Sequence, residues 1–233
     1  TYYYKTQTGV DYQTTLKNVV SYFKENGVPL AYVQLDSWWY PKGSNGSWSD
    51  SSGGYRTYEA HSELFPGGLA AFQQSLGAGL VTHNRWLDAN SPYRSQYQCS
   101  GNQVIDAAFW KDRAAYLKAA GVLVYEQDWL SRNGLPNQNN LTDQDAFLDN
   151  MAKAMGDAGL DIQYCMPLAR HILQSTKYTS VTNSRVSSDR FASGNYKDFF
   201  HGSRLAWSVR LWPWTDVFMS SERDNLVLST LSA

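Results

Sequence analysis

The fold is decided by a short apolar run that ends in acids: residues 122–128 read Val-Leu-Val-Tyr-Glu-Gln-Asp. A run of this length is typical of a parallel strand that is buried on both faces and exposes its polar carboxyl end. Residues 30–36, Leu-Ala-Tyr-Val-Gln-Leu-Asp, follow the same pattern. We therefore predict a parallel strand at each stretch, with an acid at its end.

Outward from these two stretches, strand and helix patterns alternate along the whole chain. Further strands are predicted at residues 2–4, 80–83, 162–166, 180–183 and 210–212. Three helices have both a cap and a glycine stop: one runs from Asp11 to Gly27, one from Asp106 to Gly121, and one from a capping box of Thr142 and Asp145 to Gly159. Three further helices are predicted at 69–76, before residue 210 and at 225–228. This alternation indicates a parallel sheet with helical crossovers.

The polar strand ends favour a closed barrel over an open sheet. Acids, amides or aromatic residues end each predicted strand, as expected where catalytic groups gather at the carboxyl-terminal mouth of a barrel. No glycine-rich dinucleotide fingerprint follows the first strand, which argues against a Rossmann arrangement. We predict an α/β fold, a (β/α)8 TIM barrel formed as a single catalytic domain by residues 1–233. Seven strands are counted, so we expect the last strand to belong to a longer protein.

Composition limits the partners that this chain can bind. The net charge is −1 and 18% of the residues are charged, so no basic stripe is available for nucleic acid. Apolar runs are too short for a membrane span. The chain has nine tryptophans and sixteen tyrosines, whose faces can stack on the C–H surface of sugars, although most of these rings are expected in the core. A glycoside or oligosaccharide is the expected partner.

Neither a metal nor a cofactor is expected. The four histidines, at positions 61, 83, 171 and 201, show no ligand spacing, and Cys99 and Cys165 form no metal pattern and leave disulfide pairing open. Asn45 and Asn140 each begin a glycosylation sequon in a polar stretch. We therefore expect a secreted glycoprotein with N-glycans at these two positions.

Five motifs occur in a fixed order at the predicted strand ends. They are residues 35–39 (Leu-Asp-Ser-Trp-Trp), 65–69 (Phe-Pro-Gly-Gly-Leu), 124–128 (Val-Tyr-Glu-Gln-Asp), 185–189 (Arg-Val-Ser-Ser-Asp) and 214–218 (Trp-Thr-Asp-Val-Phe). Each motif is weak alone, but in this order and at barrel spacing the set resembles the α-galactosidase clan of glycoside hydrolases, families 27 and 36 with the raffinose synthases. The resemblance covers nearly the whole chain.

The resemblance implies a retaining glycoside hydrolase that cleaves α-linked sugars through a glycosyl-aspartate intermediate. Asp128 matches the nucleophile and Asp189 the acid/base, since such chemistry needs one ionised and one protonated carboxyl group. Arg185 matches a substrate-binding arginine. The remaining substrate-binding candidates are Asp36, Trp39, Trp86, Glu126, Trp214 and Asp216, with Trp129 as a further stacking candidate. From the residues alone, Asp128 could instead cap a helix, and Asp36 and Asp216 could be structural.

Two positions depart from the family pattern. Ser37 replaces the second Asp of an Asp-Asp pair, and Glu126 replaces a Lys two residues before the nucleophile. Because strand side chains alternate, Glu126 is expected on the same side as Asp128. We therefore expect galactose specificity to be absent. His83 and Asn84, which end the preceding strand, either line the pocket or form scaffold hydrogen bonds.

Two other functions fit the same sequence. A carbohydrate-binding or structural glycoprotein could keep the barrel without turnover, because one fold hosts many functions. Retention of both Asp128 and Asp189 counts against this reading. A transglycosidase of the raffinose synthase type would share the chemistry and would transfer the glycosyl group to a sugar instead of water.

Overall fold

One parallel sheet organises the molecule. The computed structural model describes residues 8–131, 134–189, 196–216, 223 and 227. Its sheet contains β1 (Tyr32–Leu35), β2 (Gly79–Asn84), β5 (Val122–Gln127), β6 (Asp161–Tyr164), β7 (Val181–Arg185) and β8 (Trp212–Trp214), in that order. All five neighbouring pairs are parallel. The strand predicted at residues 2–4 lies outside the described residues, as does most of the helix predicted at 225–228.

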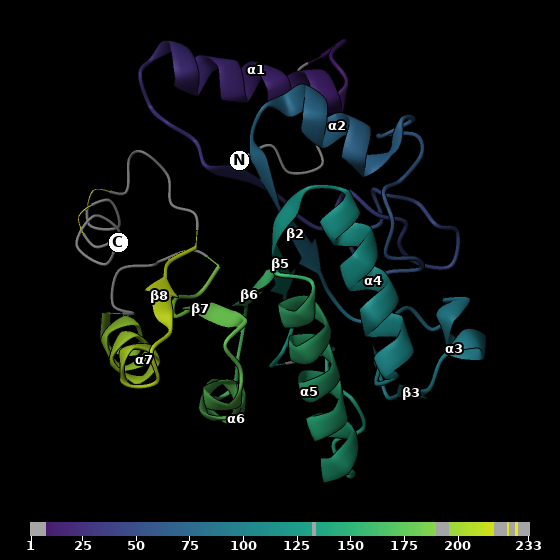
Figure 1. Ribbon diagram of the computed structural model, residues 1–233, viewed down its shortest axis with the longest axis vertical. Helices are drawn as coiled ribbons and strands as arrows, with labels where there is room; N and C mark the ends of the chain where they lie inside the picture. The colour runs from purple at the N-terminus through teal and green to yellow at the C-terminus, as the bar shows by residue number, and fades with distance from the viewer. Residues whose placement is uncertain (1–7, 132–133, 190–195, 217–222, 224–226, 228–233) are drawn as a thin grey trace.

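Helices connect the strands and cover one side of the sheet. They are α1 (Tyr12–Glu25), α2 (Gly68–Leu76), α4 (Ala107–Ala119), α5 (Leu141–Asp157), α6 (Ala169–Gln174) with the 3-10 turn η1 (Ser175–Lys177), and α7 (Tyr196–Ser208). Figure 1 shows them following one another around the outside of the curled sheet. The prediction of an α/β fold with a parallel sheet is confirmed, and the six described strands form a half-barrel. Closure to eight strands stays a prediction.

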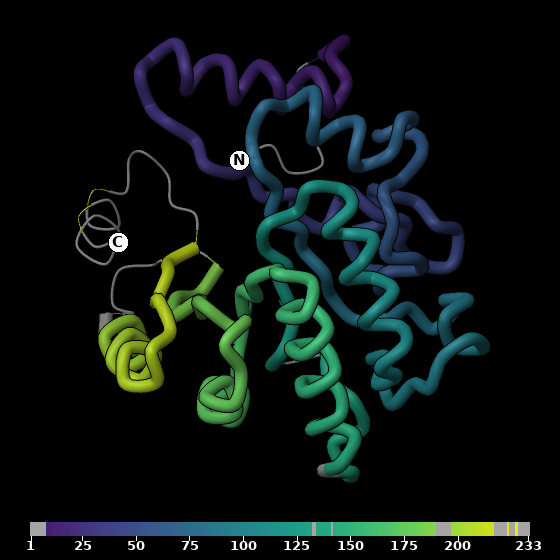
Figure 2. Tube along the Cα trace, viewed as in Figure 1, coloured from purple at the N-terminus to yellow at the C-terminus, as the bar shows by residue number. Residues whose placement is uncertain are grey.

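Two long connections lie side by side at one end of the sheet (Figures 1 and 2). The first joins β1 to α2 through residues 36–67. The second joins β2 to α4 and contains α3 (Tyr93–Gln96) and an antiparallel hairpin of β3 (Cys99–Ser100) and β4 (Gln103–Val104), which we did not predict. These strands are two residues long, too short to produce an alternating pattern. The connections meet where Tyr55 N–H donates to the Trp86 carbonyl at 2.8 Å.

The core lies between the sheet and the helices, as the periodicity indicated. The fully buried apolar side chains include Phe109 and Leu117 of α4, Phe147, Leu148, Met151 and Met155 of α5, and Leu69 and Phe72 of α2. Each such side chain contributes about 1.5–3 kcal/mol relative to an exposed one. Gly121 and Gly159 follow α4 and α5 with φ of 72° and 70°, a left-handed conformation that glycine adopts without steric cost.

The start of α5 differs from the prediction. Helix α5 begins at Leu141, and the carboxamide oxygen of Asn140 accepts hydrogen bonds from the backbone N–H groups of Thr142 and Asp143. Asp145, the expected partner of Thr142, instead pairs with Arg170 at 2.7 Å. The predicted capping box is therefore wrong by two residues, because Asn is as good an N-cap as Ser or Thr and competes for the same amides.

This capping arrangement predicts that Asn140→Ala destabilises the protein by about 1 kcal/mol, because two amides at the helix N-terminus lose their acceptor. Chemical denaturation of protein produced in a bacterial host measures the effect without interference from glycosylation. Thr142→Ala is the matched control and should change stability by less than half as much. A larger loss of stability for Thr142→Ala than for Asn140→Ala would instead identify Thr142 as the N-cap, as the sequence predicted.

Candidate functional site

The carboxyl end of β5 carries two acids that face the same side of the sheet. Glu126 is 2% exposed, and one of its carboxyl oxygens, Oε2, accepts a hydrogen bond at 2.7 Å from Gln34 of β1. Gln163 of β6 in turn donates to Gln34 Oε1 at 3.3 Å. Burial, with the negative charges of Asp128 and Asp36, raises the pKa of Glu126 well above its ordinary value. Burial therefore favours the neutral form of Glu126.

Asp128 lies two residues further on and behaves in the opposite way. The residue is 9% exposed. Its Oδ1 accepts the Trp129 backbone N–H at 2.6 Å, and its Oδ2 lies 3.1 Å from His83 Nε2. Burial alone would raise its pKa, but His83, the Cys165 thiol and the Trp129 amide together lower the pKa of Asp128 to about 2. The pKa values of the two acids are thus shifted in opposite directions, that of Glu126 upward and that of Asp128 downward.

His83 of β2 is fixed on three sides. Its Nδ1 lies 3.0 Å from the Tyr40 hydroxyl, and its carbonyl oxygen accepts the Trp39 indole N–H at 3.0 Å. Its Nε2 also lies 4.0 Å from Asp36 Oδ1, so the imidazole stands between two acids. Sequence reasoning left His83 undecided between pocket and scaffold. The structure places it in direct contact with Asp128.

The strand ends of β7 and β8 supply a second charged group. The Arg185 side chain is buried, and its Nη2 donates to Asp189 Oδ1 at 2.8 Å, while its Nη1 contacts Asp216 Oδ2. The Asp189 side chain is 73% exposed and the Asp216 side chain 22% exposed. The structure therefore joins these three predicted residues through one guanidinium group.

The aromatic candidates divide into core and site residues. Trp39 is fully buried and packs edge-to-face on Tyr40 and Tyr58, so it supports His83. That Trp39 contacts substrate stays a prediction. Trp86 and Trp129 are half-buried and meet edge-to-face at 4.7 Å. Trp129, directly after Asp128, has a φ of 62°, which costs energy for a bulky residue.

The guanidinium group of Arg85 holds the two half-buried tryptophans from one side. It lies 4.8 Å from the Trp86 ring centre and 6.0 Å from that of Trp129. Its Nη1 donates to the Ser51 and Gly53 carbonyls, each at 3.1 Å, which anchors it to the loop after β1. Trp214, the third stacking candidate, is also half-buried, at the end of β8.

Sequence reasoning missed Gln34, Gln163 and Lys42. Gln34 and Gln163 had a signal, since Gln34 is the lone polar residue of β1 and Gln163 interrupts the apolar run of the strand predicted at 162–166. Lys42 had none, because it lies in a Ser/Gly-rich loop. It is fully buried, and its Nζ donates to the Ser37 carbonyl at 2.5 Å. Burial and the charge of Arg85 lower the pKa of Lys42 to about 7.

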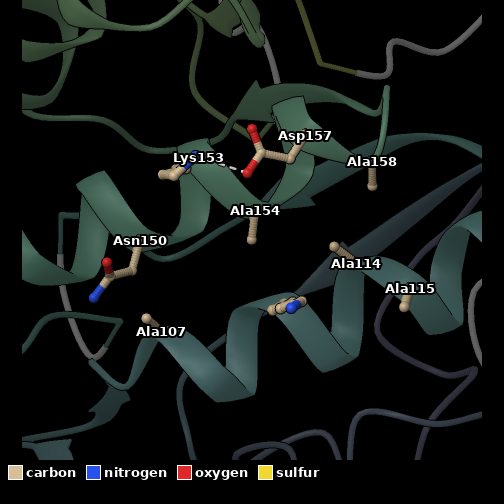
Figure 3. Close-up of a pocket in the computed structure, with 9 residues that line it drawn as sticks. Ala107, Ala114, Ala115, Asn150, Lys153, Ala154, Asp157 and Ala158 are labelled. Carbon is tan, nitrogen blue, oxygen red and sulfur yellow. Dashed lines mark hydrogen bonds and ion pairs between the residues drawn. The ribbon is translucent and has the colours of Figure 1, made fainter.

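Away from the strand ends, the described residues contain no comparable cluster of charged and aromatic side chains around a cavity. A groove between α4 and α5 is floored by alanines and edged by the ion pair of Lys153 and Asp157, and no strand-end residue lines it (Figure 3). No group of three or more metal-ligating side chains occurs within the described part of the chain. Cys99 and Cys165 are both free thiols. None of the described helices is both long and apolar enough to cross a membrane.

Solved structures with a similar fold exist at low sequence identity. The glycoside hydrolase family 27 β-L-arabinopyranosidase of Geobacillus stearothermophilus matches 88% of this chain and 57% of its own, with a TM-score of 0.58 and 15% identity. The α-galactosidase of Thermus thermophilus, solved with stachyose, matches 93% of this chain and 61% of its own, with a TM-score of 0.51 and 14% identity. The chain therefore spans a little more than half the length of these enzymes and shares their fold.

Two further comparisons found nothing. No protein-family model matches the sequence. No curated protein matches it either.

The opposite pKa shifts of Glu126 and Asp128 predict opposite effects on stability. The folded-state pKa of Glu126 lies above its ordinary 4.5, so its favourable contribution to the free energy of unfolding is complete below pH 4.5 and is lost as the pH rises. Glu126→Gln should therefore be more stable than the wild type at pH 7, with no gain near pH 4. The free energy of unfolding in urea between pH 3 and 8 measures this. A uniform loss at every pH would mean that Glu126 is ionised in the fold.

Asp128→Asn is the matched comparison for this experiment. Folding lowers the pKa of Asp128 from 3.8 to about 2, so its favourable contribution to the free energy of unfolding is complete above pH 3.8 and is lost as the pH drops toward 2. This variant should lose about 2 kcal/mol at pH 7, at about 1.4 kcal/mol per pKa unit. The deficit should shrink as the solution is acidified below pH 4.

Proposed function

We propose that this chain forms part of the catalytic barrel of a retaining glycoside hydrolase that cleaves α-linked sugars, with Asp128 as nucleophile and Asp189 as acid/base. The observation that carries the proposal is the state of Asp128. It is an almost buried carboxyl group directly after a parallel strand, whose pKa three donors lower to about 2, while burial raises the pKa of its neighbour Glu126. Such a separation of pKa values is typical of catalytic acids.

The first chemical step uses both aspartates. An oxygen of the Asp128 carboxylate forms a bond to the anomeric carbon, and the bond from that carbon to the departing oxygen breaks. The electron pair goes to the departing oxygen, which takes a proton from Asp189. Asp189 is then a carboxylate, and the Arg185 guanidinium, 2.8 Å away, stabilises that charge.

The second step reverses these roles. Water forms a bond to the anomeric carbon and gives a proton to Asp189, while the bond to Asp128 breaks and its electron pair returns to the carboxylate. Asp36 and Asp216 are proposed to accept hydrogen bonds from sugar hydroxyls. Trp86, Trp129 and Trp214, all half-buried, are proposed to stack on sugar rings.

The proposed sugar differs from galactose at the position that Glu126 reaches. A neutral carboxyl group offers both a donor and an acceptor, whereas the family's Lys offers only donors. Gln34 and Gln163, which hold Glu126, extend this neutral polar surface. We propose that this corner selects an α-linked sugar other than galactose.

The nucleophile is tested on the full-length protein with a panel of 4-nitrophenyl α-glycosides. We expect Asp128→Gly to lose turnover and azide to restore it, because azide can enter the space left by the side chain. The product should be a glycosyl azide of inverted anomeric configuration. Asp128→Asn, which fills the space, is the control and should be inactive with or without azide. Normal turnover by Asp128→Asn would overturn the assignment, and sugar binding without turnover by the wild type would favour the non-catalytic glycoprotein.

The acid/base is tested by varying the leaving group. Asp189→Ala should lower kcat/KM for a disaccharide by about 10²–10⁴-fold, the usual contribution of general acid catalysis. For a 2,4-dinitrophenyl glycoside, whose departing phenolate needs no proton, the first step should be much less affected. Asp157→Ala, at an exposed acid on α5, is the control. Equal losses on both substrates would exclude Asp189 as the general acid.

A further inference from the structure

His83 is the side chain that contacts Asp128 most directly from another strand. It lies on β2, next to β5, and its backbone is in register with Glu126. The residue is 3% exposed, and both ring nitrogens have partners, the Tyr40 hydroxyl and the Asp128 carboxylate. Neither the chemistry proposed above nor the family motifs assign it a role.

The position of the ring proton follows from the partners. An ionised carboxylate can only accept, so the nitrogen 3.1 Å from Asp128 Oδ2 must carry the hydrogen. In a neutral imidazole Nδ1 is then an acceptor, and the Tyr40 hydroxyl donates to it. In an imidazolium both nitrogens donate, and the Tyr40 oxygen accepts. In either case Nε2–H points at Asp128, and Tyr40 helps to keep it there.

The surroundings keep the imidazole in place. The Trp39 indole N–H holds the His83 carbonyl oxygen. Tyr40, whose ring lies parallel to the imidazole within 9°, packs against Trp39 and Tyr58. These rings belong to the loop after β1 and are buried. The donor that faces Asp128 is therefore preorganised by fully packed neighbours.

We propose that His83 is a positioning residue that acts through Asp128, making its carboxylate a better leaving group in the second step of the reaction. The proposal rests on the function proposed above. In that step the bond between the anomeric carbon and Asp128 breaks, and the negative charge returns to the carboxylate. A donor on Oδ2 stabilises this returning charge more than it stabilises the neutral ester that precedes it.

The same reasoning predicts an unequal effect on the two steps. In the first step Asp128 loses its charge as it attacks, so the His83 hydrogen bond stabilises the starting state at least as much as the transition state. Removal of the donor should slow the second step selectively. The glycosyl-aspartate ester should then accumulate, which lowers kcat and KM together and leaves kcat/KM nearly unchanged.

The test compares three variants of the full-length protein with the wild type. For His83→Ala we expect kcat to fall by about 10- to 100-fold, the range for a lost hydrogen bond to a charged group, with a parallel fall in KM. Intact-protein mass spectrometry during turnover should show an adduct of one glycosyl unit on the peptide that contains Asp128. His83→Gln can place an amide N–H near the position of Nε2 and should recover most of kcat. Tyr40→Phe, which keeps the imidazole, should give a smaller fall and a weaker adduct.

His171→Gln is the matched control, because His171 is equally buried but lies on α6 with its Nδ1 bonded to the Leu168 amide. It should show wild-type kcat and no adduct. A fall in kcat/KM without adduct in both His83→Ala and Tyr40→Phe would overturn the proposal. Azide rescue of Asp128→Gly would still hold in that case, so the role of Asp128 would be retained. If His83→Ala does not fold, Tyr40→Phe decides alone, and a kcat and adduct level equal to wild type would overturn the proposal.

Discussion

The placement of an ionised carboxylate in an almost buried position is the constraint on which the site depends. Asp128 loses most of its hydration at the end of β5, and an uncompensated charge there would take up a proton. The compensation comes from three separate elements: the amide of Trp129, the imidazole of His83 on β2 and the thiol of Cys165 after β6. Adjacent parallel strands are needed to bring these donors together.

The raised pKa of Glu126 follows from the same constraint. Two carboxylates on alternate residues of one strand cannot both ionise cheaply in a poorly solvated place. The donors near Asp128 settle which of the two carries the charge, and Glu126 is left with the amide of Gln34. A polar patch thus continues from Asp128 to Glu126 of β5, Gln34 of β1 and Gln163 of β6.

The aromatic loop after β1 gives this arrangement its rigidity. At one end of this loop, Trp38 stacks on Tyr12 of α1 with the ring centres 4.5 Å apart. Further along, the Tyr58 hydroxyl donates to the Thr82 carbonyl at 3.3 Å. Trp39 and Tyr40 in the same loop hold His83. The abundance of aromatic residues, which suggested sugar stacking, therefore serves two purposes. The rings of residues 38–40 are buried and support His83, whereas Trp86 and Trp129 remain partly exposed.

The sequence by itself determined the local structure and the order of polar strand ends. Period and caps predicted α1, α2, α4 and α5 to within a few residues, because burial of one helix face sets the spacing of its apolar residues. The short helices α3 and α6 were not predicted. Alternation along β5 placed Glu126 on the same side as Asp128. Only the tertiary structure decided which groups face each other across strands: Gln34 with Glu126, His83 with Asp128, and Arg185 with Asp216. These contacts join residues up to 92 positions apart, and no local pattern encodes them. The protonation of each acid depends on those contacts, since a pKa is set by neighbours in space and not by neighbours in sequence.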